Sequence, residues 1–327
     1  MRDTAAVTCS AMRFGIRPLA KSAYVMPKAL AWAQQSSRSY DHVLAYWGNY
    51  AGTCAYLFHR LQGLRIPFSL FVHAGIDLYH DQVYMREKLR YADNIVTCSA
   101  FNREYIKDQF PDVFNEISEK IYVHHHGLDF ATLSYEPRGR LPQRVIAVGM
   151  LETYKGFDYL IRAARELISR GRNIEIELIG DGKQRDSLKD LANELGLGDR
   201  LRFRGLLRPE EVHLAMQQAT ILVHPSNGLN DGVPNVIKEA MAVGTPVVAS
   251  DVAGIPELLG NGQYGMLVPT RDTTALANAM EILLTDDALR RRFADAARQH
   301  VETNFDLWRA GELLADRLRS SVRLNRN

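Results

Sequence analysis

Short apolar runs alternate with longer amphipathic stretches through the second half of the chain. Apolar runs bounded by turn residues predict buried strands, and the amphipathic stretches between them predict helices. Strands that alternate with helices indicate βαβ units, so this half is expected to form a complete doubly wound parallel sheet. The expected strands are residues 144–149, 174–180, 201–205, 220–225, 246–250 and 265–269, and the expected helices include 208–216, 272–285, 287–302 and 305–322.

The first half shows the same alternation over fewer units. The expected strands are residues 41–47, 66–73, 94–99 and 120–126, with a helix at 50–62. Residues 133–143 contain two prolines and a glycine without an apolar period, which is typical of a linker. The pattern predicts an α/β fold whose first domain (1–142, linker included) is incomplete by one or two βα units, a second domain at 143–304, and a last helix at 305–327.

Composition narrows the class of protein. The chain has 327 residues, 46% of them hydrophobic and 24% charged, which suits two ordinary globular domains. A net charge of +2 gives no case for nucleic acid as a partner, and no window reads as a transmembrane helix. Cys9, Cys54 and Cys98 are too few and too scattered for a disulfide framework or a zinc site. These features predict a cytoplasmic protein.

Residues 1–40 depart from this balance, with six basic residues, one acid and several large apolar side chains. One interpretation is a basic helix and loop on a globular domain. A second is a surface that contacts anionic lipids, which would place the protein peripherally at the inner face of the cell membrane. A third is an organellar transit peptide. The sequence leaves all three open.

The sharpest chemical pattern lies at residues 230–259. Asp231 stands in a loop beside Gly232 and Pro234, and Glu239 follows inside the next helix. The start of that helix presents free N–H groups and a positive dipole end, which suits a diphosphate flanked by two carboxylates that hold sugar hydroxyls. The alternative for the pair alone is a surface loop with an aspartate cap.

A series of motifs resembles family 4 of the retaining glycosyltransferases. The central block, Asp231-x7-Glu239 with "EAMAVGTPVVASDVAGIPE", resembles that family's E-x7-E signature. The other matches keep their order over roughly residues 41–320: "FVHAGIDL" (71–78), "ADNIVTCS" (92–99), "HHGLDF" (125–130), "VGMLETYKGFDYLIRA" (148–163) and "LIGDGKQRDSLKDLA" (178–192). The resemblance implies the GT-B fold, in which two Rossmann-like domains face each other across a cleft that holds the donor. In that fold the last helix, 305–327, is expected to cross back to the first domain.

The resemblance also implies roles for individual residues. Lys155 would neutralise the departing diphosphate, Asp231 would contact the transferred sugar in place of the usual Glu, and His73 would reach that sugar from the facing domain. Glu239 would bind the donor ribose. The rest of the implied donor site is Gly149, Met150, Leu207 (beside the base), Gly232, and the backbone N–H groups of Asn235 and Val236.

The implied reaction moves a sugar from a UDP- or GDP-sugar to a glycan or lipid-linked acceptor, in polysaccharide or glycolipid assembly. It would be a front-face transfer by a hexosyltransferase that keeps the anomeric configuration, with no cofactor and no metal. The sequence contains no Asp-x-Asp triplet, which disfavours a metal-dependent sugar transferase of the other common fold.

Two departures from the family pattern keep other functions open. Met150 stands where the family has an Arg, and the glycine-rich first turn of the first domain has no counterpart, as expected for a fragment, a misplaced start or a decayed gene. The alternatives are an inactive donor-binding protein that needs a partner chain, and a nucleotide-sugar epimerase of the same fold.

Two further patterns carry little weight. "GDGKQR" (180–185) lacks the third glycine of a dinucleotide-binding loop. His124, His125 and His126 could suggest a metal site, but consecutive residues at a strand end point in different directions.

Overall fold

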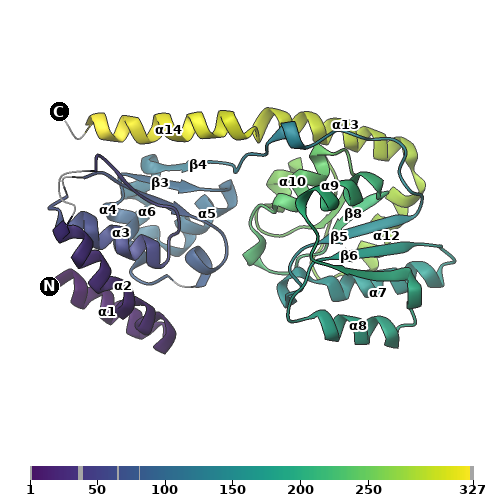
Figure 1. Cartoon of the computed structure of the whole chain (residues 1–327), viewed down its shortest axis with the longest axis horizontal. Helices are drawn as coiled ribbons and strands as arrows, with labels where there is room; N and C mark the ends of the chain where they lie inside the picture. The colour runs from purple at the N-terminus through teal and green to yellow at the C-terminus, as the bar shows by residue number, and fades with distance from the viewer. Residues whose placement is uncertain (1, 36–39, 65, 81, 325–327) are drawn as a thin grey trace. The chain divides into compact units, whose positions relative to one another are not determined.

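The computed structural model describes residues 2–35, 40–64, 66–80 and 82–324, and the chain divides into two compact units. Unit 1 comprises Met1–His126 and Arg309–Asn327, and unit 2 comprises Gly127–Trp308. Each unit is an α/β structure built on its own parallel sheet, and the two are described separately (Figure 1).

Unit 2 has a parallel sheet with the strand order β10-β9-β8-β5-β6-β7 among its described residues. The strands are β5 (Arg144–Val148), β6 (Glu175–Ile179), β7 (Leu201–Gly205), β8 (Ile221–His224), β9 (Val247–Ser250) and β10 (Met266–Val268). The order reverses between β5 and β8, so both neighbours of β5 come later in the chain. The doubly wound sheet predicted from the apolar runs is therefore confirmed, and ligands of such sheets bind at the carboxyl ends of the strands near this reversal.

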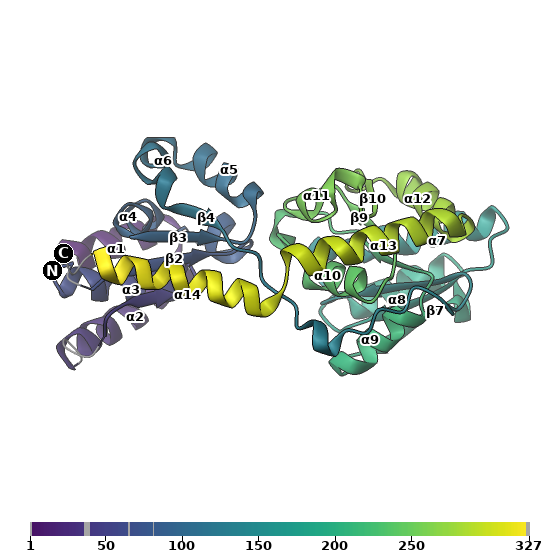
Figure 2. The same ribbon diagram turned by 90° about the horizontal axis from the view of Figure 1, so that it is seen from above.

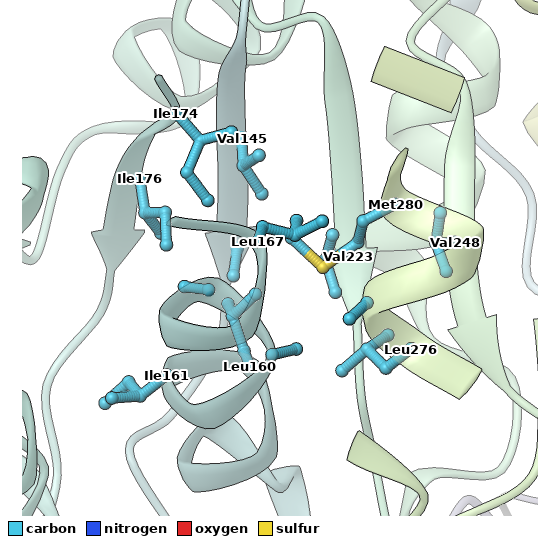
Figure 3. Close-up of a cluster of buried hydrophobic side chains, with 14 of the residues drawn as sticks. Val145, Leu160, Ile161, Leu167, Ile174, Ile176, Val223, Val248, Leu276 and Met280 are labelled. Carbon is cyan, nitrogen blue, oxygen red and sulfur yellow. The ribbon is translucent and has the colours of Figure 1, made fainter. Parts of the chain in front are cut away.

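Helices cover the sheet of unit 2. They are α7 (Phe157–Ser169), α8 (Arg185–Glu194), α9 (Pro209–Gln218), α10 (Asn235–Ala242), α11 (Ile255–Leu258), α12 (Thr273–Thr285) and α13 (Asp287–Asn304). Helices α7 and α12 pack together, as do α10 and α13 (Figures 1 and 2). Figure 3 shows Leu160 and Leu167 of α7 meeting Val145, Val223 and Met280, all at most 1% exposed. Burial of such side chains contributes roughly 1.5–3 kcal/mol each and fixes the sheet beneath the loops.

Unit 1 has a parallel sheet in the order β1-β2-β3-β4 among its described residues. The strands are β1 (Val43–Ala45), β2 (Phe68–Val72), β3 (Asn94–Thr97) and β4 (Ile121–Val123). The helices are α1 (Arg2–Arg13), α2 (Ile16–Gln35), α3 (Tyr50–Leu61), α4 (Met85–Tyr91), α5 (Ala100–Gln109), α6 (Pro111–Ile117) and the later part of α14 (Leu307–Leu324).

The end of the chain returns to unit 1. Residues from Arg309 onward belong to that unit (Figure 1). There the guanidinium of Arg317 in α14 lies 5.2 Å from the centroid of the Tyr122 ring in β4. Arg317 also donates a hydrogen bond to Asn94 of β3, and Asn94 donates one to the Ser321 hydroxyl. The last helix was predicted to begin at residue 305, but Phe305 and Asp306 are not helical and α14 starts at Leu307.

Residues 133–143, predicted as a linker, pack on unit 2, and the division between the units falls at 126/127 instead. The reason is Arg140, whose guanidinium donates to the carbonyl oxygens of Met216 and Gln217 at the end of α9 and of Val243 at the end of α10. A cation near the carboxyl end of a helix satisfies its last carbonyls and its negative dipole end. One arginine therefore ties this proline-containing segment to two helices.

The basic N-terminal region forms helices α1 and α2, with α2 packed on α3. Val7, Ala11 and Ala29 are buried, whereas Ile16 is 85% exposed. None of the described helices is long and apolar enough to cross a membrane.

Candidate active site

Glycines bring the loops after β5 and β6 and the end of β7 into backbone contact. Gly149 donates its N–H to the Ile179 carbonyl, and Gly180 donates its own to the Gly205 carbonyl. Gly180 has a φ of +136°, and a Cβ there would lie 1.9 Å from the Gly149 carbonyl oxygen. Only glycine fits such an approach. The loop that starts at Gly149 and leads to Lys155 is therefore fixed by its neighbours.

Lys155 ends a short 3₁₀ turn and is held inside the unit. The next residue, Gly156, has a φ of +65°, and a Cβ on it would lie 2.1 Å from the Pro225 carbonyl oxygen. This close approach brings the loop after β5 against the loop after β8. Lys155 is only 8% exposed, and its Nζ donates to Oδ1 of Asp231 at 2.6 Å.

Asp231 has a second partner, His224, the last residue of β8. Nε2 of His224 lies 2.5 Å from Oδ2 of Asp231, and because an ionised carboxylate only accepts hydrogen bonds, this nitrogen carries the proton. His224 is 1% exposed, and its Nδ1 has no hydrogen-bond partner in the described part of the chain. The imidazole therefore holds one carboxylate oxygen in place and leaves the other to Lys155.

These contacts set the charge of the site. Burial by itself raises the pKa of the Asp231 carboxyl, but His224 and then Lys155 lower it more, so the net pKa lies well below its usual range. Asp231 is thus ionised at neutral pH. The Lys155–Asp231 pair is a buried, hydrogen-bonded ion pair.

Helix α10 starts directly beyond Asp231. Its N-cap is Pro234, which has no side-chain hydrogen bond to the first turn, so the leading N–H groups of Asn235 and Val236 have no side-chain cap. Asn235 is exposed, Val236 is half-buried and Gly232 is buried. Uncapped N–H groups at a helix start suit an anion, and here they lie four and five residues beyond Asp231.

Glu239 lies one turn further along α10, facing His213 of α9 at 3.9 Å. Burial raises the pKa of its carboxyl, although His213 and Lys238 partly oppose this. The carboxylate accepts no hydrogen bond from the described residues. A partly buried carboxylate with so few donors gains free energy from ligand hydroxyls that donate to it.

The structure places the other predicted residues as follows. Met150 is 59% exposed in the loop between Gly149 and Lys155, and Leu207 is half-buried just beyond β7. His73 directly follows β2 in unit 1, so it lies in the other unit from the Lys155–Asp231 pair. The three consecutive histidines do diverge: His125 bonds the Cys98 carbonyl while His126 stacks on Phe71.

No group of three or more metal-ligating side chains occurs in the ranges that the structure describes.

His224 is the residue that sequence reasoning missed. Its signal was weak, because a histidine that ends an apolar strand is commonly structural. A hint lay in its position: the carboxyl end of the strand beside β5, where open α/β sheets place ligand-facing side chains.

Comparison with solved structures defines the class of fold. The structure of Anabaena Alr3699/HepE in complex with UDP and glucose matches with a TM-score of 0.74 at 22% identity, covering 90% of this chain and 81% of that one. Sucrose-phosphate synthase (tll1590) from Thermosynechococcus elongatus matches with a TM-score of 0.68 at 23% identity, covering 82% and 72%. The chain has the GT-B fold, as the sequence predicted.

Sequence comparison then finds a family match within unit 2. Residues 140–300 match the family model described as glycosyl transferases group 1. The chain is 34% identical over 208 residues to an alpha-D-kanosaminyltransferase of Streptomyces kanamyceticus, covering 64% of this chain and 50% of the relative. It is 33% identical over 220 residues to a glycogen synthase of Mycobacterium tuberculosis, covering 67% and 52%. The chain spans about half the length of these curated relatives.

Proposed function

We propose that unit 2 binds a nucleotide-diphosphate sugar and that the protein transfers the sugar to an acceptor hydroxyl with retention of anomeric configuration. The observation that carries the proposal is the Lys155–Asp231 ion pair, 2.6 Å long and buried, directly before the uncapped start of α10. A cation and free N–H groups suit a diphosphate, and a carboxylate suits sugar hydroxyls.

Each group then has a defined task. The N–H groups of Asn235 and Val236 bind the diphosphate, and Lys155 stabilises the negative charge that grows on it as the sugar leaves. Asp231, oriented by His224, accepts hydrogen bonds from the transferred sugar. Glu239 accepts them from the ribose, and Gly149, Met150, Leu207 and Gly232 border the nucleotide.

The transfer is of the front-face type. The departing phosphate takes the acceptor proton, so no cofactor and no metal is required. His73 of unit 1 is proposed, from the family resemblance alone, as a further sugar-binding residue. The proposal follows the family 4 resemblance in its motifs and is supported by the pairing of Lys155 with Asp231.

The donor is proposed to be a UDP-sugar, with a GDP-sugar as the second choice. The support is the Anabaena HepE structure, whose complex holds UDP and glucose. A glycan or lipid-linked acceptor in polysaccharide assembly is proposed because one relative is a glycogen synthase and another is named for amylovoran biosynthesis.

A thermal-shift panel of UDP-, GDP- and ADP-sugars tests the proposal. A ligand that binds only the folded state raises the melting temperature. At 100 times its Kd it adds about 2.7 kcal/mol to the free energy of unfolding. We expect one nucleotide class to give a clear shift, and Glu239→Gln to reduce it because the amide is a weaker acceptor for ribose hydroxyls. Absence of any shift in a folded chain would contradict the proposal.

The reaction type is tested on the donor that binds. The proton NMR coupling of the anomeric centre in the product should match that in the donor. Inversion would contradict the retaining mechanism, and a changed sugar without any acceptor-linked product would favour an epimerase.

We also propose that the protein is cytoplasmic and contacts the inner face of the cell membrane through α1 and α2. Met12, Phe14 and Ile16 are 53%, 44% and 85% exposed beside Arg13 and Arg17. Apolar side chains flanked by cations suit an anionic lipid surface. We expect co-sedimentation with vesicles rich in phosphatidylglycerol, and its loss in Phe14→Glu/Ile16→Glu. Equal sedimentation of this variant and the original chain would contradict the contact.

A further inference from the structure

Five rings gather at the carboxyl ends of β1, β2 and β4 in unit 1. We refer to Tyr46, Trp47, Phe71, His73 and His126 as the ring cluster. The His73 ring centroid lies 4.4 Å from that of Trp47 and 4.4 Å from that of Phe71, where the two rings are parallel within 9°. His126 stacks on Phe71 at 5.3 Å, and Tyr46 lies 5.0 Å from Phe71.

The cluster has a buried layer and an exposed layer. Phe71 and His73 are 0% and 8% exposed, whereas Tyr46 and Trp47 are 44% and 48% exposed. The exposed rings also carry polar groups. The Tyr46 hydroxyl lies 3.3 Å from Nδ1 of His126, and the Trp47 indole N–H has no partner within the described ranges. Large rings backed by other rings thus present both an apolar face and hydrogen-bonding atoms.

Buried charged groups hold the turn that carries the exposed rings. Oδ2 of Asp77 accepts the N–H of Gly48 at 2.9 Å and that of His73 at 3.0 Å, which ties the loop after β1 to the loop after β2. Lys88 donates from Nζ to the Gly48 carbonyl at 2.6 Å. Asp77 and Lys88 are both 0% exposed.

Burying the charges of Asp77 and Lys88 costs desolvation free energy. A turn without a defined role would not need such buried charged groups. Asp77 itself lies in a π-helical turn, Ile76–His80, a rare conformation that is frequent at functional sites. The turn is therefore preorganised, and Trp47 and Tyr46 are presented in fixed positions.

We propose that Tyr46 and Trp47 form a platform that binds a carbohydrate acceptor, with a pyranose ring lying on the Trp47 face. One face of a pyranose presents polarised C–H groups, which the negative face of an aromatic ring attracts, and its edge presents hydroxyls. The indole N–H and the tyrosine hydroxyl then bond ring hydroxyls. This inference rests on the proposed transfer reaction and narrows its acceptor to a sugar, bound by rings that the family motifs do not include.

The test measures saccharide binding without the donor, by saturation-transfer difference NMR on the full chain. The probes are trisaccharides of glucose, galactose, mannose and N-acetylglucosamine. We expect the C–H protons of at least one to receive saturation, Trp47→Ala to lose at least nine-tenths of it, and Trp47→Phe to keep most of it because the ring remains. Tyr46→Ala is the second variant, and Tyr24→Ala is the matched control, since Tyr24 is a 67% exposed tyrosine of the same unit.

A donor thermal shift measured on the same variants separates the two proposals. A shift that is unchanged in Trp47→Ala, together with loss of the saccharide signal, supports the platform. The platform is overturned if no trisaccharide gives a signal. It is also overturned if Trp47→Ala and Tyr46→Ala both retain the signal. A donor shift that disappears in Trp47→Ala would assign the ring to the donor site and also overturns the platform. Saccharide binding without any donor shift would contradict the proposed transfer and leave the platform standing.

Discussion

Lys155→Met is expected to slow sugar transfer by about 100- to 1000-fold, as is typical when one preorganised donor is removed from a developing negative charge. Methionine keeps most of the volume of this buried side chain but removes the ammonium group. Because Lys155 is proposed to act on the departing diphosphate, the loss should fall mainly on kcat. Initial rates with a saturating UDP-sugar and acceptor measure it.

Two control variants separate this effect from a loss of folding. Lys155→Met leaves the buried Asp231 carboxylate with His224 as its remaining partner, so the variant should also be less stable. Adding Asp231→Asn removes the uncompensated charge and should restore much of the stability without restoring turnover. Lys183→Met changes a lysine of the same unit whose side chain is 85% exposed, and it should alter neither turnover nor stability. Wild-type turnover in the Lys155→Met variant would contradict the assigned role.

Gly180→Ala is expected to destabilise unit 2 by about 2–5 kcal/mol, from the sum of a positive-φ penalty and overpacking. The added Cβ would lie 1.9 Å from the Gly149 carbonyl oxygen, so one of the two loops has to move. Donor binding should weaken together with stability, since the displaced loop leads to Lys155. Urea unfolding and the donor thermal shift measure the two effects.

The matched control is Gly171→Ala. Gly171 has a φ of +83°, and a Cβ there would have nothing within 4 Å, so this variant has the backbone penalty alone, about 1–2 kcal/mol. If both variants lost the same stability and neither affected donor binding, the packing of the two loops would not position the site.

The strands of unit 2 were predictable because both faces of the sheet are covered. A strand buried on both faces is a continuous apolar run, and residues 144–149 and 246–250 predicted β5 (Arg144–Val148) and β9 (Val247–Ser250) within about one residue at each end. The helix predicted at 50–62 is α3, Tyr50–Leu61. Strand β1 is shorter than its apolar run, because Tyr46 and Trp47 leave the sheet for the ring cluster.

The arrangement of the site was only partly predictable. The motifs identified Lys155, Asp231 and Glu239 as functional candidates, but not the 2.6 Å pairing of the first two, which are 76 positions apart in the chain. His224 contacts Asp231 because the loop between them folds back on β8, and no periodicity encodes such a loop. The attachment of Arg140 to two helix ends was hidden for the same reason, since prolines near it indicated a linker and its partners lie far away in sequence.

A crystal structure of the chain with the nucleotide diphosphate that gives the largest thermal shift tests the central claim most directly. The account predicts the diphosphate at the start of α10, within hydrogen-bond distance of the Val236 N–H and of Lys155 Nζ, with the ribose hydroxyls on Glu239. A nucleotide bound elsewhere, with the Lys155–Asp231 pair unchanged and no contact to α10, would contradict it.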